Sequence, residues 1–390
     1  MFPKTARHVL CELNFVQKYK GNLSLGLHNI VMVMSLYNIF GSFRIKALFS
    51  KMRYKFVIIV SFLVFGLKAI AQEGIPVYFD YLSDNYYLVF PSMAGVSQGG
   101  KIRATARKQW FDVDDAPSLQ TINAHFRLGD GPSGIGAIVF NDANGYHSQT
   151  GMKLTYAHHL RMGGDDVRAL NQLSFGLSGT ILQSSLDESE FRSVIPDPSI
   201  AGIKLSASYY NVDVGLSYNF QEFYSHVAII NALGSKRNVY YRDRADDPNQ
   251  LVIDNIRRYL VSAGYIFGRN EWQVEPSILF QLTDFTKEKT VDINTKIYKD
   301  VDFGRIWGGL SYRRSFDGAQ FQTATGFGEQ RLQLITPILG ANIKNFLVSY
   351  NYSYQMGDIR FSNGGFHQIT LGYDFGQKER RYDCYCPAAQ

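Results

Sequence analysis

Residues of the types that usually carry out chemistry are few in this chain, and their spacing does not assemble a catalytic group. His158 and His159 are neighbours, so in an extended strand their side chains point to opposite faces and cannot chelate one metal ion. The pair His147-Ser148 would suit a hydrolase of the barrel phospholipase type, but such a site also needs a correctly placed base and a third, orienting group. We therefore expect no enzymatic activity and keep a hydrolase as a remote alternative.

Candidate metal and cofactor ligands are equally scattered. Cys384 and Cys386 lie in the C-terminal tail, and two thiols do not complete a structural metal site. The acidic stretches Asp243–Asp247 and Asp284–Glu288 contain calcium-type ligands, but solvated charged loops explain them more simply. The glycines of Gly129–Gly136 lack the sequence context of a phosphate-binding loop. We expect no cofactor and no bound metal.

The elements that must position any functional residue are strands. After residue 71 the chain alternates apolar and polar residues over most of its length, as in the segments 212–220, 344–354 and 366–375. A soluble β-sandwich alternates too, but these segments run to about 9–11 residues, the length that a tilted strand needs to cross a bilayer. Aromatic residues also gather near the segment ends, as at the edges of membrane barrels. We predict an all-β fold, a transmembrane antiparallel β-barrel whose polar face lines a wet lumen.

The number of strands follows from counting the alternating segments. About 16 candidates can be distinguished: 100–110, 118–128, 134–141, 150–161, 171–182, 201–210, 212–220, 223–231, 257–267, 271–282, 289–298, 302–312, 320–328, 332–339, 344–354 and 366–375. A short turn at Asn211 is expected to separate two of them. Because bacterial barrels have an even number of strands and some candidates are halves, we predict about 14 strands, with about 16 as the alternative. The longer connections, Gln183–Ile200, Ser235–Asp254 and Gln355–Gly365, are expected to face outward, and Lys236–Asp247 to form part of a polar lip.

An export signal is predicted inside the chain rather than at its beginning. A basic flank precedes an apolar run of 12 residues, Phe56–Leu67, and the small residues of Ala69-Ile70-Ala71 form a cleavage site. The run is shorter than the roughly 20 residues of a membrane helix. Met52 is therefore the expected start and residues 1–51 an upstream extension that is not made, with a membrane helix in Leu25–Phe43 as the alternative.

The resulting organisation is a signal peptide at 52–71, a plug-like N-terminal segment at 72–99, the barrel at 100–375 and a C-terminal periplasmic tail at 376–390. Removal of the signal changes the charge of the protein, because residues 1–71 hold ten of the 40 Lys and Arg residues and one of the 34 acids. The exported part has 30 basic and 33 acidic residues, a net charge of −3. It gives no support for nucleic-acid binding, which requires a concentrated basic face.

The first third of the exported part carries more specific motifs. An aromatic, non-alternating segment, Val77–Phe90, leads into Phe90-Pro91-Ser92-Met93-Ala94-Gly95. Arg107-Lys108-Gln109-Trp110 ends the first alternating segment and is followed by Ala116-Pro117. A glycine-rich strand then ends in Asn141-Asp142-Ala143-Asn144-Gly145. In this order the motifs resemble those of the PorP/SprF family of the Bacteroidetes type IX secretion system, and the resemblance extends over 72–375.

The resemblance implies a non-enzymatic outer-membrane protein of a Gram-negative, Bacteroidetes-type bacterium that assists secretion or gliding. Its expected partners are outer-membrane lipid, the translocon and periplasmic ring of the system, and the C-terminal domain of secreted adhesins. The chain departs from the family pattern at Phe90, where Asn is usual, at Met93, and in its tail 376–390, for which we entertain contact with a periplasmic partner or no role. The rival interpretation is an outer-membrane channel or transporter for small or hydrophobic solutes.

The positions that match the family motifs are the candidate site residues: Arg107, Gln109, Trp110, Pro117, Asn141, Asp142 and Gly145. Arg107 is expected to place a charge in the lumen that pairs with an acid or a carboxyl-terminal segment. Trp110 is expected to anchor a strand end at the membrane interface. Asn141-Asp142 is expected to form a turn locked by its side chains. Each of these residues has a purely architectural role as its alternative.

Overall fold

The computed structural model describes residues 80–111, 113, 115–162, 169–191, 202–233, 256–268, 271–284, 286–323, 326–356 and 364–376. These residues all belong to one compact unit of the chain, 68–390. The predicted upstream extension 1–51, the signal peptide 52–71, the polar lip at Lys236–Asp247 and the tail cysteines lie outside the described residues.

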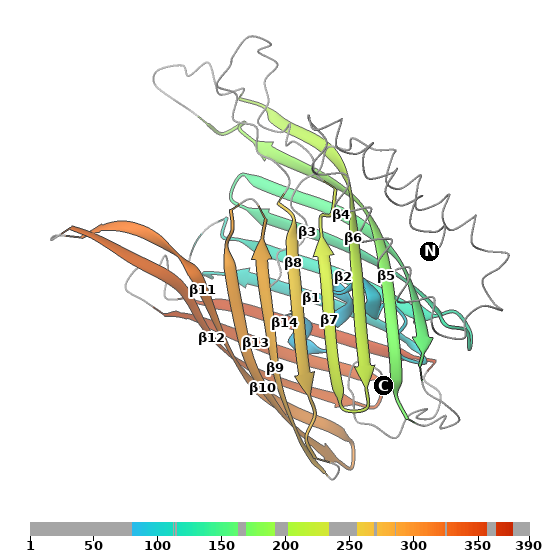
Figure 1. Cartoon of the computed structure of the whole chain (residues 1–390). Coiled ribbons are helices and arrows are strands. Elements are labelled where there is room, and N and C mark those ends of the chain that lie inside the picture. Colours follow the sequence, from blue (N-terminus) through green and yellow to red (C-terminus); the bar gives the residue numbers. More distant parts are fainter. Residues whose placement is uncertain are drawn as a thin grey trace, which may run out of the picture. The chain divides into compact units, whose positions relative to one another are not determined.

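Fourteen antiparallel strands close into a barrel, in which each strand pairs with its neighbours in the sequence and β1 pairs with β14 (Figure 1). The strands are β1 (Gly100–Gln109), β2 (Ser118–Arg127), β3 (Ser133–Asn144), β4 (His147–Arg161), β5 (Asn171–Asp187), β6 (Lys204–Phe220), β7 (Phe223–Ile230), β8 (Arg258–Tyr265), β9 (Trp272–Thr283), β10 (Lys289–Val301), β11 (Gly304–Thr323), β12 (Gly326–Ile343), β13 (Phe346–Met356) and β14 (Phe366–Phe375). Closure pairs every strand on both sides, as a lipid environment requires. The predicted fold class and the count of about 14 strands are confirmed.

The two surplus candidates disappear because neighbouring segments merge. The predicted turn at Asn211 is wrong, since β6 runs without a break through this residue, whose side chain is buried in the lumen. The segments 302–312, 320–328 and 332–339 form only two strands, β11 and β12. The break expected after 312 is a register shift of β11 against β12 between Arg314 and Gly318, which is a bulge and not a turn.

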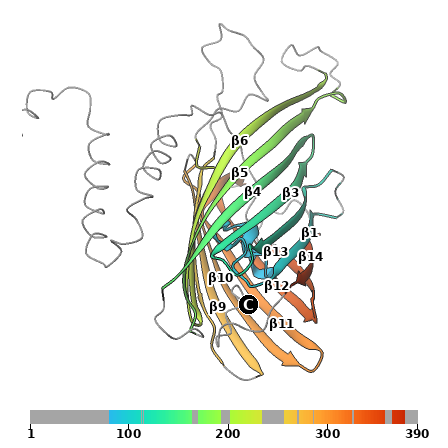
Figure 2. The same cartoon turned by 90° about the vertical axis from the view of Figure 1, so that its right-hand side faces the viewer.

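The connections divide the barrel into two unlike ends (Figure 2). Short links such as 221–222, 302–303 and 344–345 lie at one end, together with the start of β1 and the end of β14; we name it the short-turn end. The strand ends that are joined by the links 188–203, 231–257 and 357–365 lie at the other, which we name the long-loop end. Because outer-membrane barrels have short periplasmic turns and longer extracellular loops, the long-loop end is the extracellular one.

The outer surface carries the apolar side chains of the alternating pattern. Ile122, Leu154, Leu339 and Leu371 are each more than half exposed and represent this belt. Exposed aromatic residues gather at the short-turn end, as in the girdle of a membrane barrel: Phe126, Phe220, Phe223, Tyr265, Phe267, Trp272, Phe303, Phe346 and Tyr373. Within the described part of the chain no helix is both long and apolar enough to span a bilayer.

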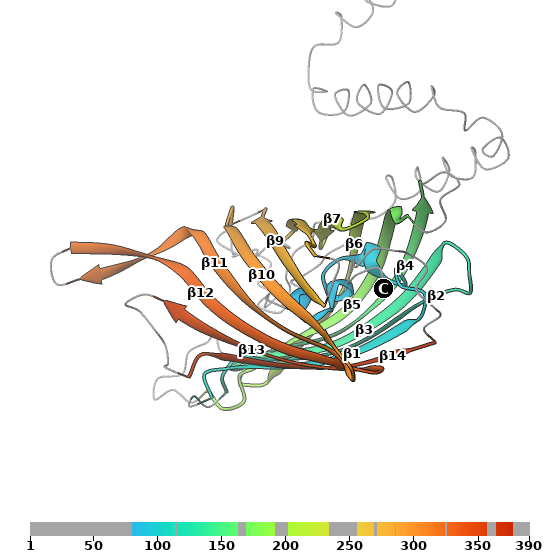
Figure 3. The ribbon, with the colours of Figure 1, turned by 90° about the horizontal axis from the view of Figure 1, so that it is seen from below.

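Residues 80–99, here called the plug, lie inside the curve of the strands (Figure 3). They form three short 3-10 helices, η1 (Asp80–Ser83), η2 (Tyr86–Leu88) and η3 (Pro91–Met93), whose aromatic and aliphatic side chains are almost fully buried. Polar side chains of the inner wall are buried as well: Thr370 bonds to Thr105 of β1, and Asn123 and Ser217 bond to Asn85 and Ser92 of the plug. The polar alternation thus serves contacts between wall residues and with an internal segment.

Candidate functional site

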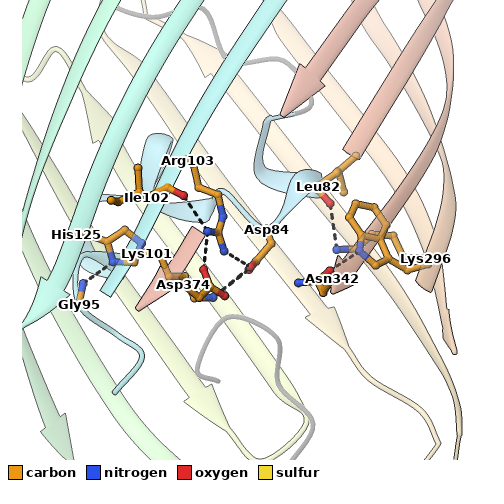
Figure 4. A network of polar contacts seen from close by, with 11 residues as sticks. Leu82, Asp84, Gly95, Lys101, Ile102, Arg103, His125, Lys296, Asn342 and Asp374 are labelled. Carbon is orange, nitrogen blue, oxygen red and sulfur yellow. Dashed lines mark hydrogen bonds and ion pairs between the residues drawn. The ribbon is translucent and has the colours of Figure 1, made fainter. Parts of the chain in front are cut away.

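The plug is fastened near the short-turn end through Asp84 (Figure 4). Its Oδ2 lies 2.9 Å from Nη2 of Arg103 and 3.2 Å from Nζ of Lys101, both on β1. Nη1 of the same Arg103 lies 2.6 Å from Oδ1 of Asp374 on β14. Burial by itself raises the pKa of Asp84, but Lys101 and Arg103 outweigh this effect and hold the pKa below its usual value. The carboxylate is therefore charged and forms an ionic link between the plug and the wall.

A second contact point is Glu275 of β9, whose side chain is fully buried. Tyr86 of the plug donates a hydrogen bond of 3.0 Å to its Oε1, and the wall residues Tyr224 and Tyr298 also donate to this carboxylate. Lys296 of β10 places Nζ 3.2 Å from Oε2. Burial, followed by the charge of Glu275, raises the pKa of Tyr86, so its hydroxyl stays protonated and acts as a donor.

Further contacts join the plug to strands around the barrel. Tyr81 donates to Oδ2 of Asp292 at 3.0 Å, while Arg313 binds the same carboxylate through Nε and Nη2, at 2.6 Å each. Further hydrogen bonds join neutral groups: Tyr87 with Thr155, Ser83 with Asn351, Asn85 with Asn123, and Gly95 N–H with His125. Arg127 donates to the carbonyl oxygens of Gly95 and Val96, and Lys296 donates to that of Leu82. Strands far apart in the sequence therefore hold one short segment.

The charges of the inner wall largely neutralise one another without the plug. Among the described residues, three ion pairs with both partners deeply buried join wall residues only, namely Lys153–Asp213, Lys296–Glu275 and Arg313–Asp292. Against them the plug presents hydroxyl and amide groups, with Asp84 as its charged contact. The buried cations Lys101 and Arg103 also pair with Asp84, and loss of one partner of a buried ion pair costs roughly 3–5 kcal/mol, so separating the plug from β1 carries an electrostatic cost.

The fit of η3 depends on a glycine of β5. A Cβ atom on Gly176 would overlap the backbone of Pro91 and Ser92. Close by, Oγ of Ser92 lies 2.6 Å from Oγ of Ser217 on β6. The plug backbone thus approaches the wall directly at this point, where only a residue without a side chain can stand.

The motif residues predicted from the sequence lie at the opposite, long-loop end of the barrel. The N–H of Trp110, just after β1, donates to the carbonyl oxygen of Gly365 at 2.9 Å, and its ring packs on Phe366. The N–H of Gly145, in the turn between β3 and β4, donates to the carbonyl oxygen of Asp115 at 3.0 Å. The loop 110–117 is thereby joined to its neighbours on both sides, and we name this arrangement the rim cluster.

Within the rim cluster, Arg107 faces the lumen and is buried, as predicted, and Gln109 is buried beside it. The N–H of Gln109 donates to the carbonyl oxygen of Pro117 at 2.9 Å, which closes the loop between β1 and β2. Trp110 has a φ of +48°, a left-handed conformation that bulky residues rarely adopt. Such strain persists only where the surroundings impose it, and it often marks functional positions.

The prediction of a turn at Asn141-Asp142 is wrong, because both residues belong to β3 and the turn follows at Gly145, with a φ of +57°. Asn141 instead takes part in a chain of hydrogen bonds on the outer face. Its Nδ2 donates to Oε1 of Gln120 at 3.0 Å, and Oγ1 of Thr150 donates to its Oδ1 at 3.0 Å. Asn141 therefore fixes the outer surface of β2, β3 and β4 near their extracellular ends.

The plug contacts were not predicted from the sequence, although a signal for them exists. The segment Val77–Phe90 is rich in aromatics without alternating, which suits burial on all sides rather than a strand. The charged lumen residues Arg103, Asp292 and Glu275 each occupy an inward position of an alternating strand. In the described ranges no group of three or more His, Cys, Asp or Glu residues is arranged to hold a metal ion.

Several known proteins are similar to the chain. The solved structures similar to the chain include OmpF of Salmonella typhi in complex with daunomycin, at 13% identity over 71% of this chain and 97% of that chain, with a TM-score of 0.33. CdiB from Acinetobacter baumannii is similar at 9% identity over 71% of this chain and 60% of that chain, with a TM-score of 0.38. No curated protein matches. Residues 70–373 match the family described as type IX secretion system membrane protein PorP/SprF, and the chain, an outer-membrane β-barrel, belongs to this family.

Proposed function

We propose that the protein is a non-enzymatic component of the type IX secretion or gliding machinery that assists secretion or surface attachment of adhesin-type cargo. It works in the outer membrane beside the translocon and the periplasmic ring and engages the C-terminal domain of the cargo. Membership of the PorP/SprF family supports the assignment to this secretion machinery. The observation that carries the choice of role is the plug, buried within the barrel and bound to strands on several sides.

The plug favours this role over that of a diffusive channel. A channel needs a continuous water-filled path, whereas Tyr81, Tyr86 and Phe90 are buried inside the barrel. A barrel that does not conduct solutes serves better as a platform in the membrane. Conductance of the purified protein in planar bilayers tests this point, and a steady large conductance of the intact chain would favour the channel.

The rim cluster is the surface that we assign to recognition. Arg107, Gln109, Trp110, Pro117, Asn141, Asp142 and Gly145 lie at the extracellular end, where exported cargo arrives. Backbone hydrogen bonds fix Trp110, Asp115 and Pro117 to their neighbours, so the side chains of these residues are presented by a rigid support. Rigid presentation lowers the entropic cost of binding a partner.

The experiment is complementation of a deletion strain with rim variants. Trp110→Ala should reduce secreted or surface-attached cargo while the barrel still reaches the outer membrane. Trp272→Ala removes an exposed tryptophan at the short-turn end and is the matched control. Normal secretion by a strain lacking the whole gene, together with a change in solute uptake, would overturn the proposal.

A further inference from the structure

A groove of about 560 Å³ lies on the outer side of the rim cluster. Among its lining residues are Ala106 and Lys108 of β1, Phe111 and Asp115 of the following loop, and His367 of β14. The volume falls in the range of about 300–1,000 Å³ that small-molecule sites occupy.

The strand registers place this groove on the lipid-facing side of the barrel. Ala106 lies opposite Ile369 and Lys108 opposite His367, and all four alternate with lumen-facing residues such as Arg107. Two residues further along β14 on the same face is Leu371, which is 54% exposed and belongs to the apolar belt. The groove therefore continues the membrane-facing surface at its extracellular edge.

The floor and the wall of the groove differ in chemistry. Apolar residues, among them Ala106, Ala143 and Ile369, form much of the lining. At one side Lys108 places Nζ 5.6 Å from the centre of the Phe111 ring, and that ring meets the ring of His367 edge-on at 4.6 Å. Aromatic packing holds the ammonium group beside an apolar depression, which is the arrangement that an amphiphile with an anionic head requires.

We propose that the groove binds a phosphate-bearing glycolipid of the outer leaflet, of the lipid A type. An acyl chain lies over Ala106, Ala143 and Ile369, and a phosphate is bound by Lys108. Three observations select this occupant: the groove faces lipid, it lies at the extracellular end, and Lys108 places its ammonium group on the same outer face as the apolar floor. The outer leaflet at this end supplies a ligand that is apolar and anionic at once. This inference does not depend on the secretion role.

The test uses the full-length protein purified from outer membranes in mild detergent, with bound lipid A quantified by mass spectrometry. Lys108→Glu reverses the charge at the head group, and Ala106→Trp fills the floor. The matched controls are Lys299→Glu, a lysine over the ring of Trp272 near the short-turn end, and Ala137→Trp on the outer face of β3. We expect wild type and both controls to retain lipid A, and each groove variant to retain less by about fivefold or more, as expected for loss of one partly exposed charge contact.

Folding of each variant is checked by its heat-modifiable migration on a gel. If one groove variant does not fold, the lipid A content of the other groove variant tests the proposal by itself. Equal retention of lipid A by wild type and groove variants would overturn the proposal. Retention of phospholipid in place of lipid A would overturn it too. So would a co-purifying protein that is lost with Ala106→Trp while lipid A is unchanged, because the occupant would then be a protein segment.

Discussion

Asp84 of the plug and Asp374 of the last strand bind the same side chain, Arg103 of the first strand, at 2.9 and 2.6 Å. Arg103 crosses Gly372 of β14, where a Cβ atom would meet its guanidinium. The seam at which the barrel closes, between β1 and β14, is therefore also the place where the plug is held. Docking of the plug and closure of the barrel share one buried cation.

Replacement Asp84→Asn should loosen the plug and leave the barrel closed. Arg103 keeps Asp374, so the loss is partial, and we expect a cost of about 1–3 kcal/mol. Hydrogen exchange measured by mass spectrometry should become faster in residues 80–96 and stay unchanged in the strands. Asp284→Asn breaks an exposed pair with Lys287 and serves as the control, with an effect below about 1 kcal/mol. Unchanged exchange in the plug would contradict the prediction.

The ion pairs of Asp84 also predict a dependence on pH. Because the pKa of Asp84 in the folded protein lies below its usual 3.8, the pairs contribute their full stabilisation above that value and lose it as the pH falls through the folded-state pKa. Plug protection should therefore be constant from neutral pH down to about 4 and decline below it. The protection that remains in Asp84→Asn should lack this decline, and an equal decline in both proteins would assign it to another group.

The buried carboxylate of Glu275 should be costly to alter by itself. Glu275→Gln leaves Lys296 beside a neutral amide and adds two donors where three tyrosines already donate, so we expect a loss of about 3–5 kcal/mol. The double replacement Glu275→Gln with Lys296→Met removes the stranded cation and should recover part of that loss. Urea unfolding from lipid vesicles gives the free energy of unfolding of the wild type, of each single variant and of the double variant. If the effects of the two replacements simply added, Glu275 and Lys296 would not be coupled.

The barrel could be predicted from the sequence because the pattern that indicates it is local. Each strand alternates apolar and polar residues, and a lipid environment requires every strand edge to be paired. The sequence misled at Asn211, since an asparagine favours turns in general, while this one stands at an inward position of an unbroken alternation that includes Tyr209 and Asp213. It misled again at Arg314, where a bulge and a turn produce the same interruption of the pattern.

The rim residues and the plug contacts differ in how far sequence can predict them. Arg107 follows from strand alternation, and its position facing the lumen was predicted. The partners of Glu275 come from η2, β7 and β10, and no local pattern states which inward side chains of distant strands will meet. Trp110 was identified as a motif residue from the sequence. Its left-handed backbone conformation could not be predicted, because it depends on a hydrogen bond to Gly365, which is distant in the sequence.

The contact between Gly176 and the plug gives the most direct test of the packing, because β5 offers a matched control. Gly176→Ala puts a methyl group into the backbone of Pro91 and Ser92, whereas a Cβ atom on Gly179 meets nothing within 4 Å. Gly179 lies on the outer face of the same strand, so Gly179→Ala controls for the loss of a glycine from β5 without touching the plug. Gly176→Ala should displace η3, expose the segment near Ser92 to protease and raise the bilayer conductance, while Gly179→Ala should behave as wild type. If both variants kept the plug protected and the barrel closed, η3 would not pack on β5 in the membrane, and the occluded lumen that separates a secretion component from a channel would lose its support.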